Sequence, residues 1–333
     1  MIVCGTKLSK IDYGDEEFKN RFTSILKSIS KISFFSNKLA NIPTNEFEAI
    51  FEYFMTVLML DFINYDKMVK LLIKYQEEFH ALYKMIGEID TVISISEYRR
   101  ILPFYSKPDF EDISSIMIED IYHPLVKECV TNSIYIDKNI ILTGSNASGK
   151  STFIKALALS IILSQNLYLS FSKKYTGKMS FVITSMAVRD DVLNNESYFI
   201  AEIKSLKRIL DSLNYEIRII CFIDEILKGT NTIERVAASS SILNFLEYKN
   251  CKVITASHDI ELTEIMRNFY DNYHFKEEVT DDGLTFSYKL LKGHATTKNA
   301  ILLLKFMGYN EKIIDYAVRL SKNYIENRKW DII

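Results

Sequence analysis

The spacing of apolar residues divides the chain into two parts. Between Glu16 and Arg100, apolar residues recur every three or four positions with charged residues between them, which is the period of amphipathic helices. Examples are Phe47, Ile50, Phe51, Phe54, Met68, Val69, Leu72 and Ile73. Pro103 and Pro108 end this pattern, because proline lacks an amide donor and clashes with the preceding helical turn. We therefore expect a helical domain over residues 1–105.

After Pro124 the pattern changes to short β-branched, apolar runs separated by long helical stretches. These runs are Asn139 to Thr143, Phe181 to Ser185, Arg218 to Ile223 and Lys252 to Ala256. Continuous apolar strands that alternate with helices are typical of a mostly parallel sheet that is covered on both faces. We therefore expect an α/β domain over residues 106–325, followed by a frayed tail over residues 326–333.

One pair of strands is expected to be antiparallel. The runs Phe275 to Val279 and Leu284 to Leu290 flank Asp282-Gly283, a dipeptide that readily adopts the positive φ angles of a tight turn. The pattern therefore predicts a hairpin. Two final helices are expected after it, Thr297 to Met307 and Glu311 to Asn323, joined at Gly308.

Composition limits the class of protein. The chain has 333 residues, 48% of them apolar and 25% charged, which is typical of a soluble globular protein of about two domains. Its 41 basic and 43 acidic residues give a net charge of -2, so any contact with DNA must be local or made by a partner. Four separated cysteines without a CxxC pair favour a reducing, cytoplasmic compartment. The best apolar stretch, Tyr53 to Leu60, is too short to span a membrane.

The first motif with chemistry follows the apolar run that ends at Thr143. Residues 144–151, GSNASGKS, satisfy the phosphate-loop pattern GxxxxGK(S/T), and the strand before and helix after argue against a chance match. Glycines let backbone amides surround phosphates, Lys150 reaches the β and γ phosphates, and the Ser151 hydroxyl holds Mg²⁺. We expect the Lys150 ammonium to face solvent. The predicted nucleotide-binding residues are Gly144, Ser145, Asn146, Ala147, Ser148, Gly149, Lys150, Ser151 and Thr152.

Two later strands deliver polar residues. The run Ile219 to Ile223 ends in Asp224 and Glu225. In a phosphate-loop protein the first acid can hold Mg²⁺ and the second can orient or deprotonate the attacking water. Alone, the pair could equally be solvated acids at a strand end; the phosphate loop favours the functional interpretation. The run Val253 to Ser257 delivers His258 to the carboxyl edge of the sheet, where ligands of open α/β sheets bind. A lone histidine is usually structural, but this one is placed to sense a γ-phosphate.

The order of these motifs resembles that of ABC-type ATPases, and the surrounding residues resemble the MutS family. Tyr122 to Leu125 is similar to the family's RHP(V/L), and Asp190 to Glu202 to its DD-x5-STF-x2-E. Asp224 to Thr232 is similar to DEIGRGTST, and Ser257 to Thr263 to THYFELT. The resemblance covers about residues 96–317 and implies a P-loop NTPase fold of the ABC type, preceded by a helical domain similar to the lower part of the family's lever helices.

The resemblance also implies roles for individual residues. Asn146 matches the family's loop asparagine, which lies near the γ-phosphate and the attacking water. Ser197 matches the serine that reaches across the family dimer to the partner's nucleotide. Ile134 and Tyr288 fall where the family places apolar or aromatic contacts to adenine, although Tyr288 could equally be a core residue of the hairpin. The other matching residues are Lys150, Ser151, Asp224, Glu225 and His258.

The implied function is an ATPase that uses Mg²⁺ and forms ADP and phosphate at the interface of a homodimer, in DNA mismatch repair or recombination. The family's mismatch reader uses a Phe-x-Glu motif, and no such motif precedes the phosphate loop. An alternative is an ATP-gated interaction module that signals to a protein partner without DNA. A small-molecule kinase is disfavoured, because the paired acids and the distant histidine position water rather than an acceptor hydroxyl.

Overall fold

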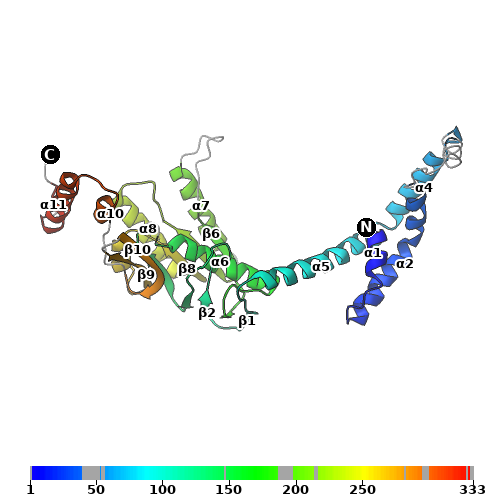
Figure 1. The fold of residues 1–333 in the computed structure, drawn as a ribbon, viewed down its shortest axis with the longest axis horizontal. Helices are drawn as coiled ribbons and strands as arrows, with labels where there is room; N and C mark the ends of the chain where they lie inside the picture. Colours follow the sequence, from blue (N-terminus) through cyan, green and yellow to red (C-terminus); the bar gives the residue numbers. More distant parts are fainter. Residues whose placement is uncertain are drawn as a thin grey trace. The chain divides into compact units, whose positions relative to one another are not determined.

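A computed structural model describes most of the chain, as two compact units divided after Ile101 (Figure 1). The described residues are 2–39, 53, 57–145, 148–186, 198–213, 217–280, 283–294, 300–327 and 329–330. The first unit is helical and the second, from Leu102, is a mixed α/β unit. Each unit has buried apolar residues of its own.

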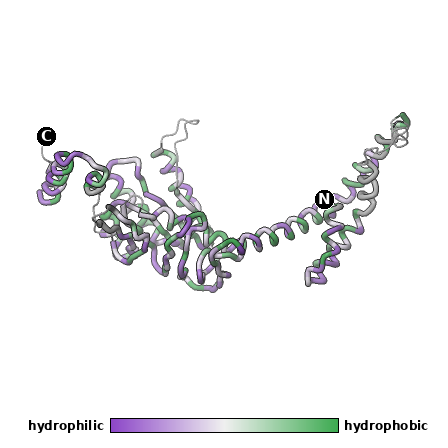
Figure 2. Tube along the Cα trace, viewed as in Figure 1, coloured by the Kyte–Doolittle hydropathy of each residue, from purple (hydrophilic) through white to green (hydrophobic). Residues whose placement is uncertain are grey.

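The helical unit contains long amphipathic helices, as the apolar spacing predicted. The long helices are α2 (Glu16–Leu39), α4 (Leu60–Lys74) and α5 (Gln76–Ile101), and the shorter α1 (Ile2–Leu8) precedes them. Hydrophobic and hydrophilic residues alternate along α5 in Figure 2. The core between α2 and α5 is formed by Phe22, Ile29, Leu82 and Met85. Phe47, Ile50, Phe51 and Phe54 of the predicted pattern lie outside the described residues.

The larger sheet of the α/β unit has the strand order β10-β9-β4-β8-β7-β6. Its strands are β4 (Asn139–Thr143), β6 (Phe181–Ser185), β7 (Ile219–Asp224), β8 (Cys251–Ala256), β9 (Tyr270–Thr280) and β10 (Gly283–Lys292). Neighbouring strands are parallel except β9 and β10, which form the expected antiparallel hairpin. The mostly parallel sheet is therefore confirmed; Asp282 of the predicted turn lies outside the described residues.

Helices cover both faces of this sheet, which explains why its strands are apolar without alternation. They are α6 (Lys150–Leu167), α7 (Tyr198–Ser212), α8 (Thr232–Glu247) and α9 (Ile260–Ile265). Alternate residues of β7 belong to different clusters: Ile220 and Phe222 share one with residues of α6, and Ile219 and Cys221 share the other with residues of α7 and α8. Both faces of the strand are consequently desolvated.

A second sheet, which the sequence pattern did not predict, has the order β1-β5-β2-β3. Its strands are β1 (Asp109–Phe110), β2 (Ile116–Ile121), β3 (Asn132–Ile136) and β5 (Lys174–Gly177). β3 alternates between buried and exposed residues, so only one face of this sheet is apolar. That face packs into the same core as α6. Strands this short leave little local signal, and β5 pairs with β1 and β2 across long stretches of chain.

The chain continues with α10 (Ala300–Phe306) and α11 (Glu311–Asn327), which pack against each other. Gly308, with φ +75°, lies between them as expected. α11 extends beyond the predicted end at Asn323, and the ring of Trp330 stacks on Tyr324 with centroids 4.3 Å apart. Across the described segments, no helix combines the length and the apolar character that a membrane span requires.

Candidate nucleotide-binding site

The loop between β4 and α6 has the backbone that a phosphate loop requires. Gly144 (φ +141°) and Gly149 (φ +104°) both adopt conformations that side chains disfavour. A Cβ atom at Gly144 would lie 2.8 Å from the Ser148 hydroxyl, and one at Gly149 would lie 3.2 Å from the Tyr288 ring. The first amides of an α-helix have no partner within the helix, and α6 begins directly after Gly149. The loop and helix together therefore form an anion site.

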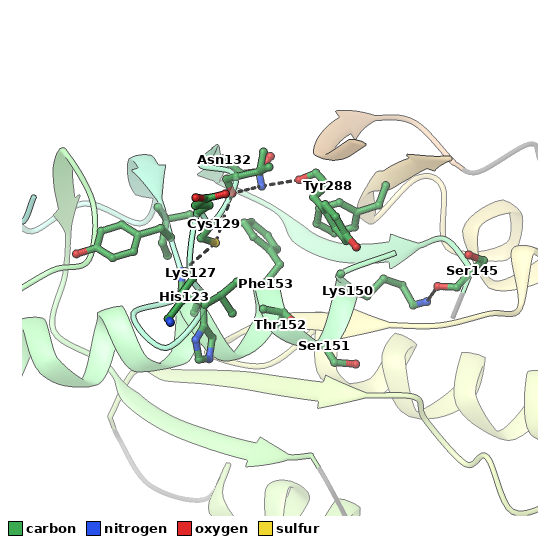
Figure 3. Close-up of a pocket in the computed structure, with 18 of the residues that line it drawn as sticks. His123, Lys127, Cys129, Asn132, Ser145, Lys150, Ser151, Thr152, Phe153 and Tyr288 are labelled. Carbon is green, nitrogen blue, oxygen red and sulfur yellow. Dashed lines mark hydrogen bonds between the residues drawn. The ribbon is translucent and has the colours of Figure 1, made fainter. Parts of the chain in front are cut away.

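Lys150 is not solvent-facing, contrary to the sequence-based expectation. Its side chain is 5% exposed, and Nζ donates hydrogen bonds of 2.7 Å to the carbonyl oxygens of Gly144 and Ser145. Figure 3 shows the lysine extending toward Ser145. A buried ammonium requires acceptors, and the loop's own carbonyl groups provide them. The positive charge is thus held inside the loop that phosphates would enter.

Asp224 and Ser151 fit the requirements of a Mg²⁺ site. Asp224 ends β7, and its Oδ1 atom is buried without a hydrogen-bond partner. A buried carboxylate oxygen without a donor is costly, and a cation would satisfy it. Ser151 lies in the first turn of α6 and lines the adjacent pocket. The described residues contain no cluster of three or more His, Cys, Asp or Glu side chains that could hold a metal. Phosphate oxygens and water would therefore supply the remaining ligands.

Glu225 and His258 come together at the carboxyl edge of the sheet. His258 Nε2 lies 2.8 Å from Glu225 Oε1, and Lys228 forms an ion pair with the other carboxylate oxygen. These partners, His258 first, lower the pKa of Glu225 to about 2. The carboxylate is therefore ionised at neutral pH. Glu225 has φ +60°, which is unusual for a residue other than glycine, and its amide donates to the Ala256 carbonyl oxygen.

A pocket of about 470 Å³ lies beside the loop. It is lined by the start of α6, by residues between Ile121 and Asn132, and by Glu225, Phe275 and Tyr288. His258 is not among the described residues that line the pocket, but it is hydrogen-bonded to Glu225, which does line it.

Tyr288 and Ile134, the two expected adenine contacts, differ in their surroundings. Tyr288 lines the pocket and has φ +52°. It lies in the irregular part of β10, between Phe286 and Leu290, where the register with β9 shifts. Ile134 is 4% exposed, pairs with Ile118 across the second sheet and belongs to the core, and it is not among the described residues that line the pocket. The expected contact of Ile134 with adenine stays a prediction.

Asn132 was missed by the sequence reasoning, although it shapes the pocket. Its Nδ2 atom donates a 3.0 Å hydrogen bond to the Tyr288 carbonyl oxygen (Figure 3). Its Oδ1 atom accepts a 2.8 Å hydrogen bond from the Leu290 amide. These bonds tie β3 to the irregular part of β10. His123 and Cys129 also line the pocket. The family-like Tyr122 to Leu125 block was the only sequence signal near them.

Three predicted site residues, Asn146, Ala147 and Ser197, lie outside the described residues, and their roles stay predictions. The structure brings the other predicted residues of the loop to one region around the start of α6. The same region contains Asp224, Glu225, His258 and Tyr288. A glycine-containing loop joins the central parallel strand β4 to a helix, and the acids follow β7, which β8 separates from β4. This arrangement defines an α/β domain of phosphate-loop architecture.

Comparison with known families identifies the kind of phosphate-loop domain. Residues 140–324, more than half of the 333-residue chain, match the family model for MutS domain V. The chain belongs to the MutS family. The matched region begins in β4 and ends within α11, so it includes the loop, both acids and His258.

Similar full-length proteins are each described as a DNA mismatch repair protein MutS. The protein from Fusobacterium nucleatum subsp. nucleatum is 27% identical over 290 residues, which cover 81% of this chain and 32% of that protein. The protein from Thermotoga petrophila is 30% identical over 267 residues, covering 77% of this chain and 33% of that protein. The chain spans about one third of the length of these relatives.

Proposed function

We propose that the α/β unit binds ATP with Mg²⁺ beside the phosphate loop and hydrolyses it to ADP and phosphate. The observation that carries this proposal is the placement of an ionised carboxylate, Glu225, at the pocket that the phosphate loop opens into. Anion-binding amides and a water-orienting acid at one edge of a sheet are the two components that phosphoryl transfer to water requires.

The loop amides and Lys150 would bind the phosphates. On binding, the β and γ phosphates replace the carbonyl oxygens of Gly144 and Ser145 as partners of the lysine. Asn146 is placed by family resemblance near the γ-phosphate. Ser151 and Asp224 would hold Mg²⁺, which neutralises phosphate charge when bound. The Tyr288 ring provides an apolar surface for the base.

Glu225 would orient the attacking water. A carboxylate whose pKa is about 2 is a weak proton acceptor, so orientation contributes more than proton removal while His258 and Lys228 hold it. Release of either partner during binding would raise its basicity. His258, bonded to Glu225, is also the residue we propose as the sensor of the γ-phosphate.

We further propose that the active unit is a homodimer in which Ser197 completes the partner's site. The support is the family resemblance of residues 190–202 and the start of α7 directly after Ser197. Mixing Ser197→Ala with Lys150→Ala subunits should restore activity at one of the two sites. No recovery in a mixture shown to contain heterodimers would contradict this arrangement.

The domain plan is part of the same proposal: a lever-like helical domain over residues 1–105, an ATPase domain over 106–325 and a tail over 326–333.

Free thiols, two of them buried at Cys221 and Cys251, support a reducing cytoplasmic setting. Full-length relatives are described as mismatch repair proteins, which supports a role on DNA. The net charge of -2 keeps the alternative, an ATP-gated protein-interaction module, in consideration.

Two experiments test the proposal. Calorimetry should find ATP binding to the wild type and a loss of at least about tenfold in affinity for Lys150→Ala, because a charge-assisted phosphate contact is removed. Equal affinities would contradict the phosphate-loop assignment. Anisotropy with duplex, mismatched and branched DNA at several salt concentrations decides between the two kinds of partner, since phosphate contacts produce a salt-dependent affinity.

A further inference from the structure

The backbone that carries Glu225 is strained. Glu225 and Leu227 have φ angles of +60° and +55°, and both carry side chains that disfavour this region. Such conformations persist only where the surrounding structure holds them. The groups that hold residues 225–229 therefore determine where the Glu225 carboxylate points.

Glu202 of α7 supplies one of these groups. Its side chain is 2% exposed, and Oε1 accepts a 3.1 Å hydrogen bond from the Lys228 amide. Burial raises the pKa of Glu202, while the amides of Lys228, Gly229 and Leu227 oppose that rise. Oε2 is buried without a hydrogen-bond partner. Burying a carboxylate costs free energy. We therefore infer that Glu202 is buried against three consecutive amides in order to hold that backbone in position.

Gly229 brings the same segment against the first turn of α7. A Cβ atom at Gly229 would lie 3.0 Å from Phe199 Cβ and 3.3 Å from Phe199 Cα. Both are atoms near the helix backbone, so α7 or the segment would have to move if a side chain were added. Two features thus connect residues 227–229 to α7. Glu202 accepts a hydrogen bond from the Lys228 amide, and Gly229 packs closely against Phe199.

We propose that Glu202 is a positioning residue, which fixes the Glu225 carboxylate through the backbone of residues 227–229. This inference rests on the proposed ATP hydrolysis. α7 begins at Tyr198, directly after Ser197 in the sequence. The hydrogen bond from the Lys228 amide to Glu202 therefore connects the first turns of α7 to the segment that carries Glu225. A displacement of the first turn of α7 is therefore transmitted to the water-orienting carboxylate.

The test compares Glu202→Met with Glu202→Gln. Methionine is similar in length but has no carboxylate oxygen to accept a hydrogen bond from the Lys228 amide. The value of kcat should therefore fall at least about tenfold, while the ATP dissociation constant stays within about twofold. Glutamine keeps an acceptor oxygen and should recover most of kcat. Hydrogen exchange of the amides of residues 227–229 should accelerate in the methionine variant. Ile209→Ala, a buried change on the same helix that removes no acceptor, should lower Tm and leave kcat and this exchange unchanged.

Wild-type kcat and wild-type exchange in a folded Glu202→Met protein would overturn the inference. If Glu202→Met does not fold, Gly229→Ala tests the same contact from the other side and should lower kcat with ATP affinity retained; an unchanged kcat there would also overturn it. Absence of hydrolysis by the wild type refutes the proposed function instead, and the exchange measurement then still decides whether Glu202 holds the segment.

Discussion

Replacing Glu225 with glutamine keeps the size of the side chain and removes its charge. The carboxylate lines the pocket and is bonded to His258. Loss of a positioned water-orienting acid should lower kcat by about 10² or more. At about 1.36 kcal/mol for each factor of ten, this is about 2.7 kcal/mol of transition-state stabilisation. ATP affinity should be retained, because the substitution leaves the loop amides and Lys150, the proposed phosphate contacts, unchanged.

The same substitution should also reduce stability by a predictable amount. The pKa of Glu225 is lowered from 4.5 to about 2, chiefly by the His258 hydrogen bond and then by Lys228. At about 1.36 kcal/mol for each pKa unit, the folded state favours the carboxylate by about 3 kcal/mol. Solvent screens part of this interaction, so we expect a loss of about 1 to 2 kcal/mol in the free energy of unfolding.

Steady-state phosphate release and urea unfolding measure these two effects separately. Glu264→Gln is a matched control, because Glu264 is exposed on α9 and is not among the described residues that line the pocket. This control should match the wild type in both assays. Turnover by Glu225→Gln within about twofold of the wild type, at equal ATP occupancy, would refute the assignment of Glu225 to the hydrolytic step.

Two further substitutions test the geometry around the site. Gly149→Ala places a methyl group 3.2 Å from the Tyr288 ring at φ +104°, so calorimetry should show ATP affinity falling at least about tenfold; Gly87→Ala, in open space on α5, should leave affinity unchanged. Arg235→Met removes the side chain that donates two hydrogen bonds, of 2.6 and 2.7 Å, to the buried Asp259 carboxylate. The free energy of unfolding in urea should fall by about 3 kcal/mol. An unchanged unfolding midpoint would contradict the importance of this ion pair.

Features set by local chemistry were predictable from the sequence. The phosphate loop needs glycine at fixed spacing, and the structure has positive φ angles at Gly144 and Gly149. β4 and β7 are continuous apolar runs because both faces of their sheet are covered. The order of motifs along the chain then indicated which strand ends meet at one edge, and β4, β8 and β7 are indeed neighbours.

Features set by distant contacts were not predictable. The second sheet pairs β1 with β5 across more than sixty residues of chain, and its short strands carry no distinctive period. Asn132 gave no signal because its role depends on the irregular part of β10, where it bonds Tyr288 and Leu290. The burial of Lys150 depends on carbonyl directions in the loop, which the motif does not encode.

The measurement that tests the central claim most directly is phosphate release from ATP by the purified chain, with and without Mg²⁺, for the wild type and Asp224→Asn. Asp224 Oδ1 is a buried oxygen without a hydrogen-bond partner, and we assign it to the metal. The wild type should release phosphate only with Mg²⁺, and the variant should lose at least about tenfold in turnover while keeping its fold. No ATP-dependent phosphate release from a folded wild type, or equal turnover by Asp224→Asn, would contradict ATP hydrolysis at this site.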